Sequence, residues 1–240
     1  MIRIGVDMSV FERFPSYRRG LVVARGVSNR GTDSVLEERL RTVEQTVVER
    51  FAGREWRQDP RIAAWLSAFG ELGIPAGSKP PSIAALVKRV AKGGRLPFIN
   101  KLVALMNVMS LENLVPCGGD DLHAVGDEIR LQPATGIETY RALGAVDTLE
   151  HPVSGEFALI DTVNGVVLCR YWCWRNSDIT KITEDTTAVA LDLDLMGTAV
   201  PVEEGDRMVR RLAEDVERFC GGYVDWELLT QDQPERVFQE

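Results

Sequence analysis

The spacing of apolar residues changes along the chain, from a helical period in the first half to short strand-like runs in the second. Leu36, Leu40, Val43 and Val47 recur at intervals of three and four residues, which predicts an amphipathic helix. The later apolar runs are short and predict strands: EIRLQ (128–132), FALID (157–161), VVLCRYW (166–172) and AVALDLD (188–194). These two kinds of block predict the mixed α/β (α+β) class, a β-sheet flanked by helices.

Capping and turn residues set the expected limits of the helices. Ser34 and Glu37 have the spacing of a capping box, which predicts that a helix begins there. Four more helices are expected: from Asp59-Pro60 to Gly70, from about Ser82 to Gly93, within 99–111, and a last one that ends at Gly221-Gly222. The predicted helices from 34 to 111 form a helical N-terminal lobe.

Two further strands are expected at the N-terminus, over 2–6 and 20–27, because the first alternates apolar residues and the second is β-branched. Asn164-Gly165 separates two of the later strands. This dipeptide predicts a tight hairpin with a type I′ turn.

The composition bounds the functional classes. The chain has 240 residues, 45% of them hydrophobic, with no repeat or low-complexity linker, so residues 1–240 are expected to form one compact unit. No run approaches the ~18 apolar residues of a membrane span, and charges interrupt the N-terminal segment where a signal peptide is apolar. Four scattered cysteines do not make a disulfide framework. We therefore expect a cytoplasmic protein without membrane association.

A basic segment stands out against the net charge of −8. Between Glu71 and Glu112 the chain has no acidic residue, but it has six basic ones: Lys79, Lys88, Arg89, Lys92, Arg95 and Lys101. Six cations can neutralise several phosphates, which predicts salt-sensitive nucleic-acid binding. The alternative is the solvated face of a helix, with basic residues in its last turn.

Common catalytic and metal-binding patterns are missing from the sequence. There is no Walker loop, no GxGxxG after a strand, no GxSxG and no HExxH. Cys169 and Cys173 could face one side of a strand, but His123 and His151 are distant in sequence and no second cysteine pair exists. We expect no metal and no cofactor, and we interpret the cysteines as small apolar residues.

The segment PCGGDDLHA (116–124) is a candidate ligand loop. Gly118 and Gly119 allow a backbone to approach a ligand closely, while Asp120, Asp121 and His123 supply candidate catalytic groups. An ordinary turn is the alternative, because glycine and aspartate are common turn residues.

Two blocks of the sequence resemble a known family. LPFINKLVALMNVMSLENLVPCGGDDL (96–122) is similar to the B3/B4 domain, the editing region of the phenylalanine–tRNA ligase beta chain, whose helix carries an I-N-x-x-V-x-x-x-N-x-x-x-L pattern. The matching residues are Ile99, Asn100, Val103, Asn107 and Leu111. ITEDTTAVALDLD (182–194) resembles the V-T-x-E-T-x-x-V-x-L-E segment of the same domain, in the right order. The resemblance implies a B3/B4-like core at about 79–194, with helical additions at about 28–78 and 203–222.

The chain departs from this family at positions that carry its chemistry. Gly118 stands where the editing site has a histidine, and residues 173–177 (CWRNS) replace its glycine-rich turn. Asp192 replaces a glutamate that is one methylene longer. The resemblance therefore implies a related pocket, but it does not imply tyrosine editing.

The segment RYWCWRNSDITKITEDT (170–186) supplies the second half of the expected pocket. Its tryptophans offer rigid aromatic faces, and its polar residues offer directed hydrogen bonds. Together with Asn100, Asn107, Gly118 and Gly119 from the other segments, the candidate ligand-binding residues are Trp172, Trp174, Arg175, Asn176, Ser177, Lys181 and Thr183. Such a pocket suits an aminoacyl ester, an amino acid or an unstacked base. The alternative is that the tryptophans belong to the core and that the arginine pairs with Asp178 or Asp192.

Three functions remain open from the sequence. The first is an enzyme that hydrolyses misacylated tRNA or another aminoacyl ester with water as the nucleophile. The second is a module that binds tRNA, aminoacyl-tRNA or an amino-acid-like ligand without chemistry. The third is a protein-interaction domain that has lost the editing activity.

Overall fold

The computed structural model describes residues 1–145 and 147–239, which form two sheets and six α-helices. One sheet has the strand order β10 (Glu235–Phe238), β1 (Ile2–Val6), β4 (Glu128–Pro133), β5 (Phe157–Asp161), β6 (Val166–Arg170) and β7 (Arg175–Asn176). It is mixed, because β1 pairs with β4 in parallel and all its other pairs are antiparallel. The second sheet is antiparallel, with the order β3 (Cys117–Asp121), β8 (Ala188–Leu195), β2 (Arg18–Arg25) and β9 (Tyr223–Leu229).

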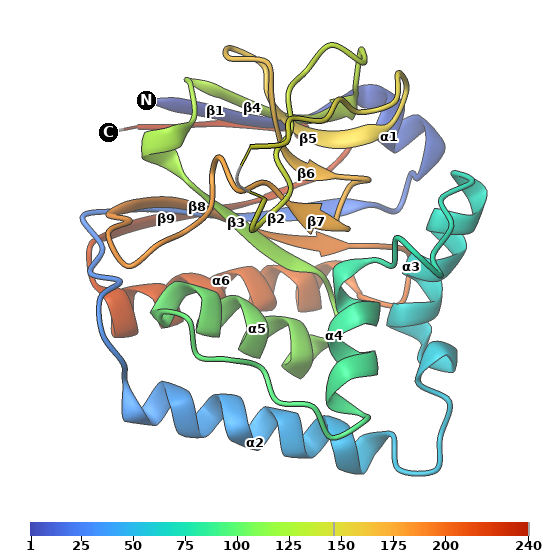
Figure 1. The fold of residues 1–240 in the computed structure, drawn as a ribbon, viewed down its shortest axis with the longest axis vertical. Coiled ribbons are helices and arrows are strands. Elements are labelled where there is room, and N and C mark those ends of the chain that lie inside the picture. The colour runs from blue at the N-terminus through green and yellow to red at the C-terminus, as the bar shows by residue number, and fades with distance from the viewer. Residues whose placement is uncertain (146, 240) are drawn as a thin grey trace.

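The elements lie in layers (Figure 1). The six-stranded sheet stacks on one face of the four-stranded sheet, and α5 (Lys101–Asn113) and α6 (Val202–Cys220) cover the other face. The helix α2 (Ser34–Arg50) packs outside α5, while α3 (Pro60–Glu71) and α4 (Ser82–Val90) stand at one end of the sheets and α1 (Met8–Arg13) lies beside the six-stranded sheet. The mixed α/β class and the sheet flanked by helices are therefore confirmed.

The two central strands of the four-stranded sheet, β8 and β2, are buried on both faces. All eight residues of β8 are buried, as are seven of the eight in β2, and the two strands pair from Arg18↔Leu195 to Arg25↔Ala188. Gly20 of β2 lets α6 approach closely, because a Cβ there would overlap the Val209 side chain. Two covered faces explain why these strands read as nearly continuous apolar runs.

Most predicted helix limits are confirmed. Asp59 caps α3 with Pro60 in its first turn, α4 begins at Ser82, and α6 ends at Cys220 before Gly221. α2 begins at Ser34 as predicted, but the predicted capping box is wrong: Asp33, not Ser34, is the N-cap, and its carboxylate accepts a hydrogen bond from the Leu36 amide at 2.9 Å. Aspartate and serine are both good N-caps, so the sequence did not separate them.

The β5–β6 hairpin is confirmed, but its predicted type I′ turn is wrong. That turn requires positive φ at both central residues, whereas Gly165 has φ 64° and Asn164 is not among the described non-glycine residues with positive φ. The connection is four residues long, 162–165. The Asp161 carboxylate organises it by accepting hydrogen bonds from the Val163 and Asn164 amides at 3.0 and 3.1 Å.

Four strands were not predicted. Residues 117–121 form β3, where a loop was expected, β7 is a two-residue strand beyond the predicted 166–172 run, and β9 and β10 follow the last helix. β3 is short and contains two glycines, a composition that disfavours strand on propensity alone. Pairing with β8 decides its conformation. None of the described helices has the length and apolar character needed to cross a bilayer.

Candidate functional site

A small, partly open cavity of about 40 Å³ lies between the two sheets. Its walls come from both halves of the pocket that the sequence predicts: Cys117, Gly118 and Asp120 on β3, and Trp172, Cys173 and Asn176 at and after the end of β6. The remaining lining residues are Arg19, Ser82, Pro116, Leu159, Cys169, Asp192 and Asp194. The structure therefore brings residues 117–120 and 172–176 together around one space.

The alternation of β8 sends two carboxylates toward this cavity. Asp192 and Asp194 both line it, while Leu191, between Ala190 and Asp192, packs toward α5 below Gly119. Successive side chains of a strand point to opposite faces of the sheet. The AVALDLD run therefore places leucines toward the helices and aspartates between the sheets.

One arginine holds these two carboxylates. Arg19 on β2 is 2% exposed, and its Nη1 lies 2.7 Å from Asp194 Oδ1, while its Nη2 lies 3.1 Å from Asp192 Oδ1. The Tyr17 hydroxyl also donates a hydrogen bond to Asp194 Oδ1 at 2.5 Å. Burial nevertheless raises the pKa of Asp194 to about 6, because the favourable charge of Arg19 only partly offsets the loss of solvent and the charge of Asp192.

Asp120 is a third buried carboxylate at the same cavity. It is 3% exposed, and its Oδ1 accepts a hydrogen bond from the Thr180 hydroxyl at 2.5 Å. Within the described residues it has no ion-pair partner at salt-bridge distance. Burial raises the pKa of Asp120 to about 7, partly offset by the Thr180 hydrogen bond. With three carboxylates around one guanidinium, the cavity has more acidic than basic groups.

Asp121 and His123, the other two candidate catalytic residues, lie outside this cavity. Asp121 caps the short 3₁₀ turn after β3, accepting hydrogen bonds from the His123 amide at 2.9 Å and from the Thr186 hydroxyl at 2.5 Å. His123 is exposed, and its Nε2 lies 2.8 Å from Thr187 Oγ1. β3 turns Asp120 inward, and the chain leaves the site before His123.

The two tryptophans separate into a core residue and a surface residue. Trp172 is 1% exposed and meets the rings of Phe14, Tyr17, Trp65 and Phe157 edge-on. It lines the cavity as a fixed wall. Trp174 is half-buried and contacts the ring of Tyr171 at 5.6 Å between centroids. Tyr171 and Trp172 have positive φ, 47° and 67°, a strained conformation for side chains of this size.

The polar residues after Trp174 also divide. Asn176 lines the cavity and donates a hydrogen bond from Nδ2 to the Gly119 carbonyl at 3.3 Å. Arg175 is exposed and donates to the Leu143 carbonyl at 3.1 Å, so the expected alternative pairing with Asp178 or Asp192 is wrong. β7 is only two residues long, so it turns one of them in and the next one out.

Six other candidate ligand-binding residues make structural contacts or lie elsewhere. Asn100 is buried as the N-cap of α5, Ser177 donates to the Arg141 carbonyl, and Lys181 pairs with Asp178. Thr183 accepts a hydrogen bond from the Asp185 amide, and Asn107 is half-buried on α5. Gly119 packs on Leu191 and Met106 beneath the cavity wall. None of the six lines the cavity.

The site contains residues that the sequence interpretation missed. Arg19 and Asp194 are the clearest cases, because both line the cavity and form a buried ion pair there. A signal for both is present in the sequence: an arginine pair opens one apolar strand, and aspartates alternate with leucines in another. Charged residues are rarely buried unless paired, so charges within two strand-like runs indicate a buried ion pair between them.

The three cavity cysteines are unsuited to nucleophilic chemistry. Burial raises the pKa of Cys117, Cys169 and Cys173 well above the usual thiol range, so each is a neutral thiol near pH 7. In the part of the chain that the structure describes, no group of three or more His, Cys, Asp or Glu side chains is arranged to hold a metal ion.

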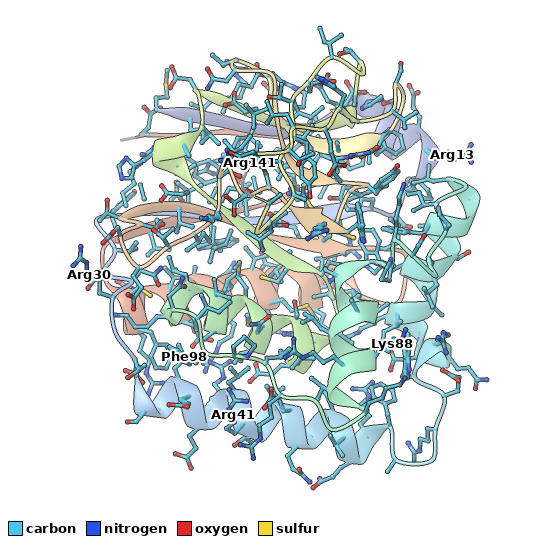
Figure 2. The ribbon with its side chains drawn as sticks, in the orientation of Figure 1. Arg13, Arg30, Arg41, Lys88, Phe98 and Arg141 are labelled. Atoms are coloured by element: carbon cyan, nitrogen blue, oxygen red, sulfur yellow. The ribbon has the colours of Figure 1, made fainter. Side chains whose placement is uncertain are left out.

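The six basic residues of the predicted basic segment also divide into some with structural contacts and some that are exposed. Lys101 donates to the Phe219 carbonyl at 2.9 Å, in the last turn of α6, and Lys79 lies 3.9 Å from the centroid of the Tyr171 ring. The other four are exposed at the C-terminal end of α4 and in the segment that follows, and we call them the α4 cationic patch: Lys88, Arg89, Lys92 and Arg95. Figure 2 shows Lys88 on the side of the molecule opposite Arg30.

Comparison with known proteins supplies the family. A model described as the B3/4 domain matches residues 64–210, which is more than half of the chain. The chain belongs to the B3/4 domain family. The matched residues include most of those that line the cavity, from Ser82 to Asp194, but not Arg19 on β2.

Among solved structures, the B3/4 chain is similar to an N-terminal fragment of the phenylalanyl-tRNA synthetase beta-subunit from Pyrococcus horikoshii. The sequence identity is 13% and the TM-score 0.44, over 92% of this chain and 49% of that chain. The protein therefore spans about half the length of the fragment it matches. No curated protein sequence matches at a significant level.

Proposed function

We propose that this B3/4 protein binds aminoacyl-tRNA and hydrolyses its ester, with the aminoacyl group in the cavity and RNA phosphates on the α4 cationic patch. The observation that carries the proposal is the small cavity that β3 and the 172–176 segment form together around buried acidic groups. The resemblance of residues 96–122 and 182–194 to the editing region of phenylalanine–tRNA ligase favours an aminoacyl-tRNA over other esters. The four cysteines are free, in keeping with the expected cytoplasmic compartment.

The helix α4 relates the two parts of this site. Ser82, its first residue, lines the cavity, and Lys88 follows six residues later near its other end. At 1.5 Å per residue, this separation is about 9 Å along the axis. With the aminoacyl group of a tRNA in the cavity, the phosphates that contact the α4 cationic patch would thus belong to nucleotides only a few positions from the aminoacylated end.

Asp120 is the proposed general base. Its pKa of about 7 leaves a substantial fraction of the carboxylate ready to accept a proton near neutral pH. In the proposed step Asp120 takes a proton from water, the water oxygen attacks the ester carbonyl, and the ribose oxygen leaves as a hydroxyl after taking up that proton. The products are the free amino acid and the uncharged tRNA.

The test is deacylation of a panel of mischarged tRNAs by the purified protein and by Asp120→Asn. Loss of a general base costs about 10²–10⁴-fold in rate, so we expect a loss in that range. Asp215→Asn is the matched control. Asp215, on α6, is also buried, but it lies outside the cavity and pairs with Arg39 and Arg211. Full activity in Asp120→Asn would remove Asp120 from this role.

Binding without chemistry is the second candidate. It is favoured by the position of His123, exposed and outside the cavity. Salt-sensitive tRNA binding without deacylation of any member of the panel would establish it. Neither binding nor deacylation would overturn the proposed function and favour a protein-interaction domain.

A further inference from the structure

We infer that the cavity is a filter for aminoacyl groups that are small and carry a free α-ammonium group. Cys173 and Asn176 set the size limit, and the excess of carboxylates over cations selects the ammonium. This inference rests on the proposed function, because it names the class of substrate that the same cavity takes.

The size limit follows from the volume and from the stiffness of the walls. The cavity volume of about 40 Å³ is far below the roughly 300–1,000 Å³ of pockets that hold drug-sized ligands. A seryl or alanyl side chain fits this space and a tyrosyl ring does not. The walls resist expansion, since four aromatic rings hold Trp172 and the Gly119 carbonyl holds Asn176.

The charge selection follows from the count of buried groups. Arg19 pairs with Asp192 and Asp194, which leaves Asp120, among the described residues, with only the Thr180 hydroxyl as a strong partner. A buried carboxylate without a cation is costly in a region of low dielectric constant. An ammonium group would supply the missing positive charge and up to three hydrogen-bond donors.

A buried donor at the same cavity is left for an acceptor on the ligand. Arg19 lines the cavity, and its Nε has no hydrogen-bond partner among the described residues. Buried polar groups are generally hydrogen-bonded, so an unpaired one in a lined cavity indicates a ligand atom or a water. The carbonyl oxygen of an aminoacyl ester is an acceptor of the required kind, and the ammonium and the carbonyl are two bonds apart in every aminoacyl group.

The test uses non-hydrolysable 3′-aminoacylamido adenosines and calorimetric titration of the wild-type protein. The seryl analogue is expected to bind. Its N-acetyl derivative should bind at least about tenfold more weakly, because it has lost the ammonium charge. The tyrosyl analogue should also bind at least about tenfold more weakly than the seryl one, because its side chain is too large for the cavity. Equal affinity for seryl and N-acetylseryl, or for seryl and tyrosyl, would overturn the filter. If no analogue binds at all, the proposed function fails together with the filter, whereas binding in this order without ester hydrolysis removes only the catalytic step.

Two sets of variants locate the filter. Asn176→Gly and Cys173→Ala enlarge the cavity and are expected to improve tyrosyl binding about tenfold. Cys220→Ala, a buried thiol outside the cavity, is the control and should change nothing in the ranking. Asp120→Asn is expected to reduce the preference for seryl over N-acetylseryl among these non-hydrolysable analogues, with Asp215→Asn as its control. Melting temperatures identify unfolded variants, and a folded Cys173→Ala or Asn176→Gly protein that still rejects the tyrosyl analogue would overturn the size limit.

Discussion

At the scale of single residues, Asp120 is the clearest case of a side chain held at a cost to stability. Its pKa is raised from 3.8 to about 7 by burial, so the folded protein holds a proton that the unfolded chain has released. A carboxyl whose folded pKa is raised makes no differential contribution below about pH 4, and it lowers the stability as pH rises toward about 7. The buried acid that suits proton transfer is therefore destabilising at neutral pH.

Asp120→Asn is expected to remove this loss. Relative to wild type, its free energy of unfolding should rise by about 1–4 kcal/mol between pH 4 and pH 8, since one pKa unit corresponds to about 1.4 kcal/mol. Chemical denaturation at several pH values measures the difference between the two proteins. A constant difference across this range would show that Asp120 ionises normally in the folded state.

At the scale of elements, β3 connects the helical layer to the cavity through adjacent glycines. A Cβ on Gly119 would overlap the Leu191 side chain and lie 3.0 Å from the Ala190 carbonyl and 3.1 Å from Met106 Sδ. A Cβ on Gly118 would lie 3.4 Å from the Asp192 carboxylate, on the cavity side. An added methyl group at Gly119 therefore tests packing against the helices, and one at Gly118 tests the space available to a ligand.

We expect Gly119→Ala to lower the free energy of unfolding by about 1–3 kcal/mol, the usual cost of overpacking, and Gly118→Ala to lower it by less than about 1 kcal/mol. Gly118→Ala should instead weaken binding of the seryl analogue, because its methyl group occupies cavity volume. Thermal melts and calorimetric titration distinguish these outcomes. Equal destabilisation by both substitutions would contradict the orientation of β3.

The elements that the sequence predicts are those with a strong local signal. α3 has an aspartate cap and a first-turn proline, and β8 is a long, mostly apolar run, so each is found near its predicted limits. β3 has no such signal, and its conformation depends on pairing with β8, about 70 residues away in sequence. Asp120 was identified from its motif, whereas Arg19 was missed because the charges in its strand and in β8 indicate an ion pair only when the two strands are considered together.

At the scale of the whole molecule, the site depends on contacts between distant parts of the chain. β2, β3, α4, the end of β6 and β8 each contribute to one cavity between the sheets. Residues that share the predicted basic segment in sequence are separated by the same folding, so Lys101 serves the end of α6 while Lys88 faces solvent. The basic segment therefore predicted more exposed cations than the structure has, and the sequence interpretation missed part of the buried acidic group at the cavity.

The reduced basic surface limits how steeply RNA binding can depend on salt. Four exposed cations neutralise at most about four phosphates, so the slope of log K against log salt concentration should be no steeper than about −4. The net charge of −8 opposes contacts elsewhere on the surface. Filter binding of uncharged tRNA from low to high salt measures this slope.

Lys88→Ala combined with Lys92→Ala is expected to make the slope shallower by about two, because each phosphate contact that is lost removes about one unit. Arg30→Ala combined with Arg207→Ala is the charge-matched control, since both arginines are exposed and lie outside the α4 cationic patch; it should leave the slope unchanged. An unchanged slope in the first pair would show that the RNA contacts another surface. The filter measured on adenosine analogues would stand in that case, because those ligands carry no phosphate, and the route of the tRNA to the cavity would have to be redrawn.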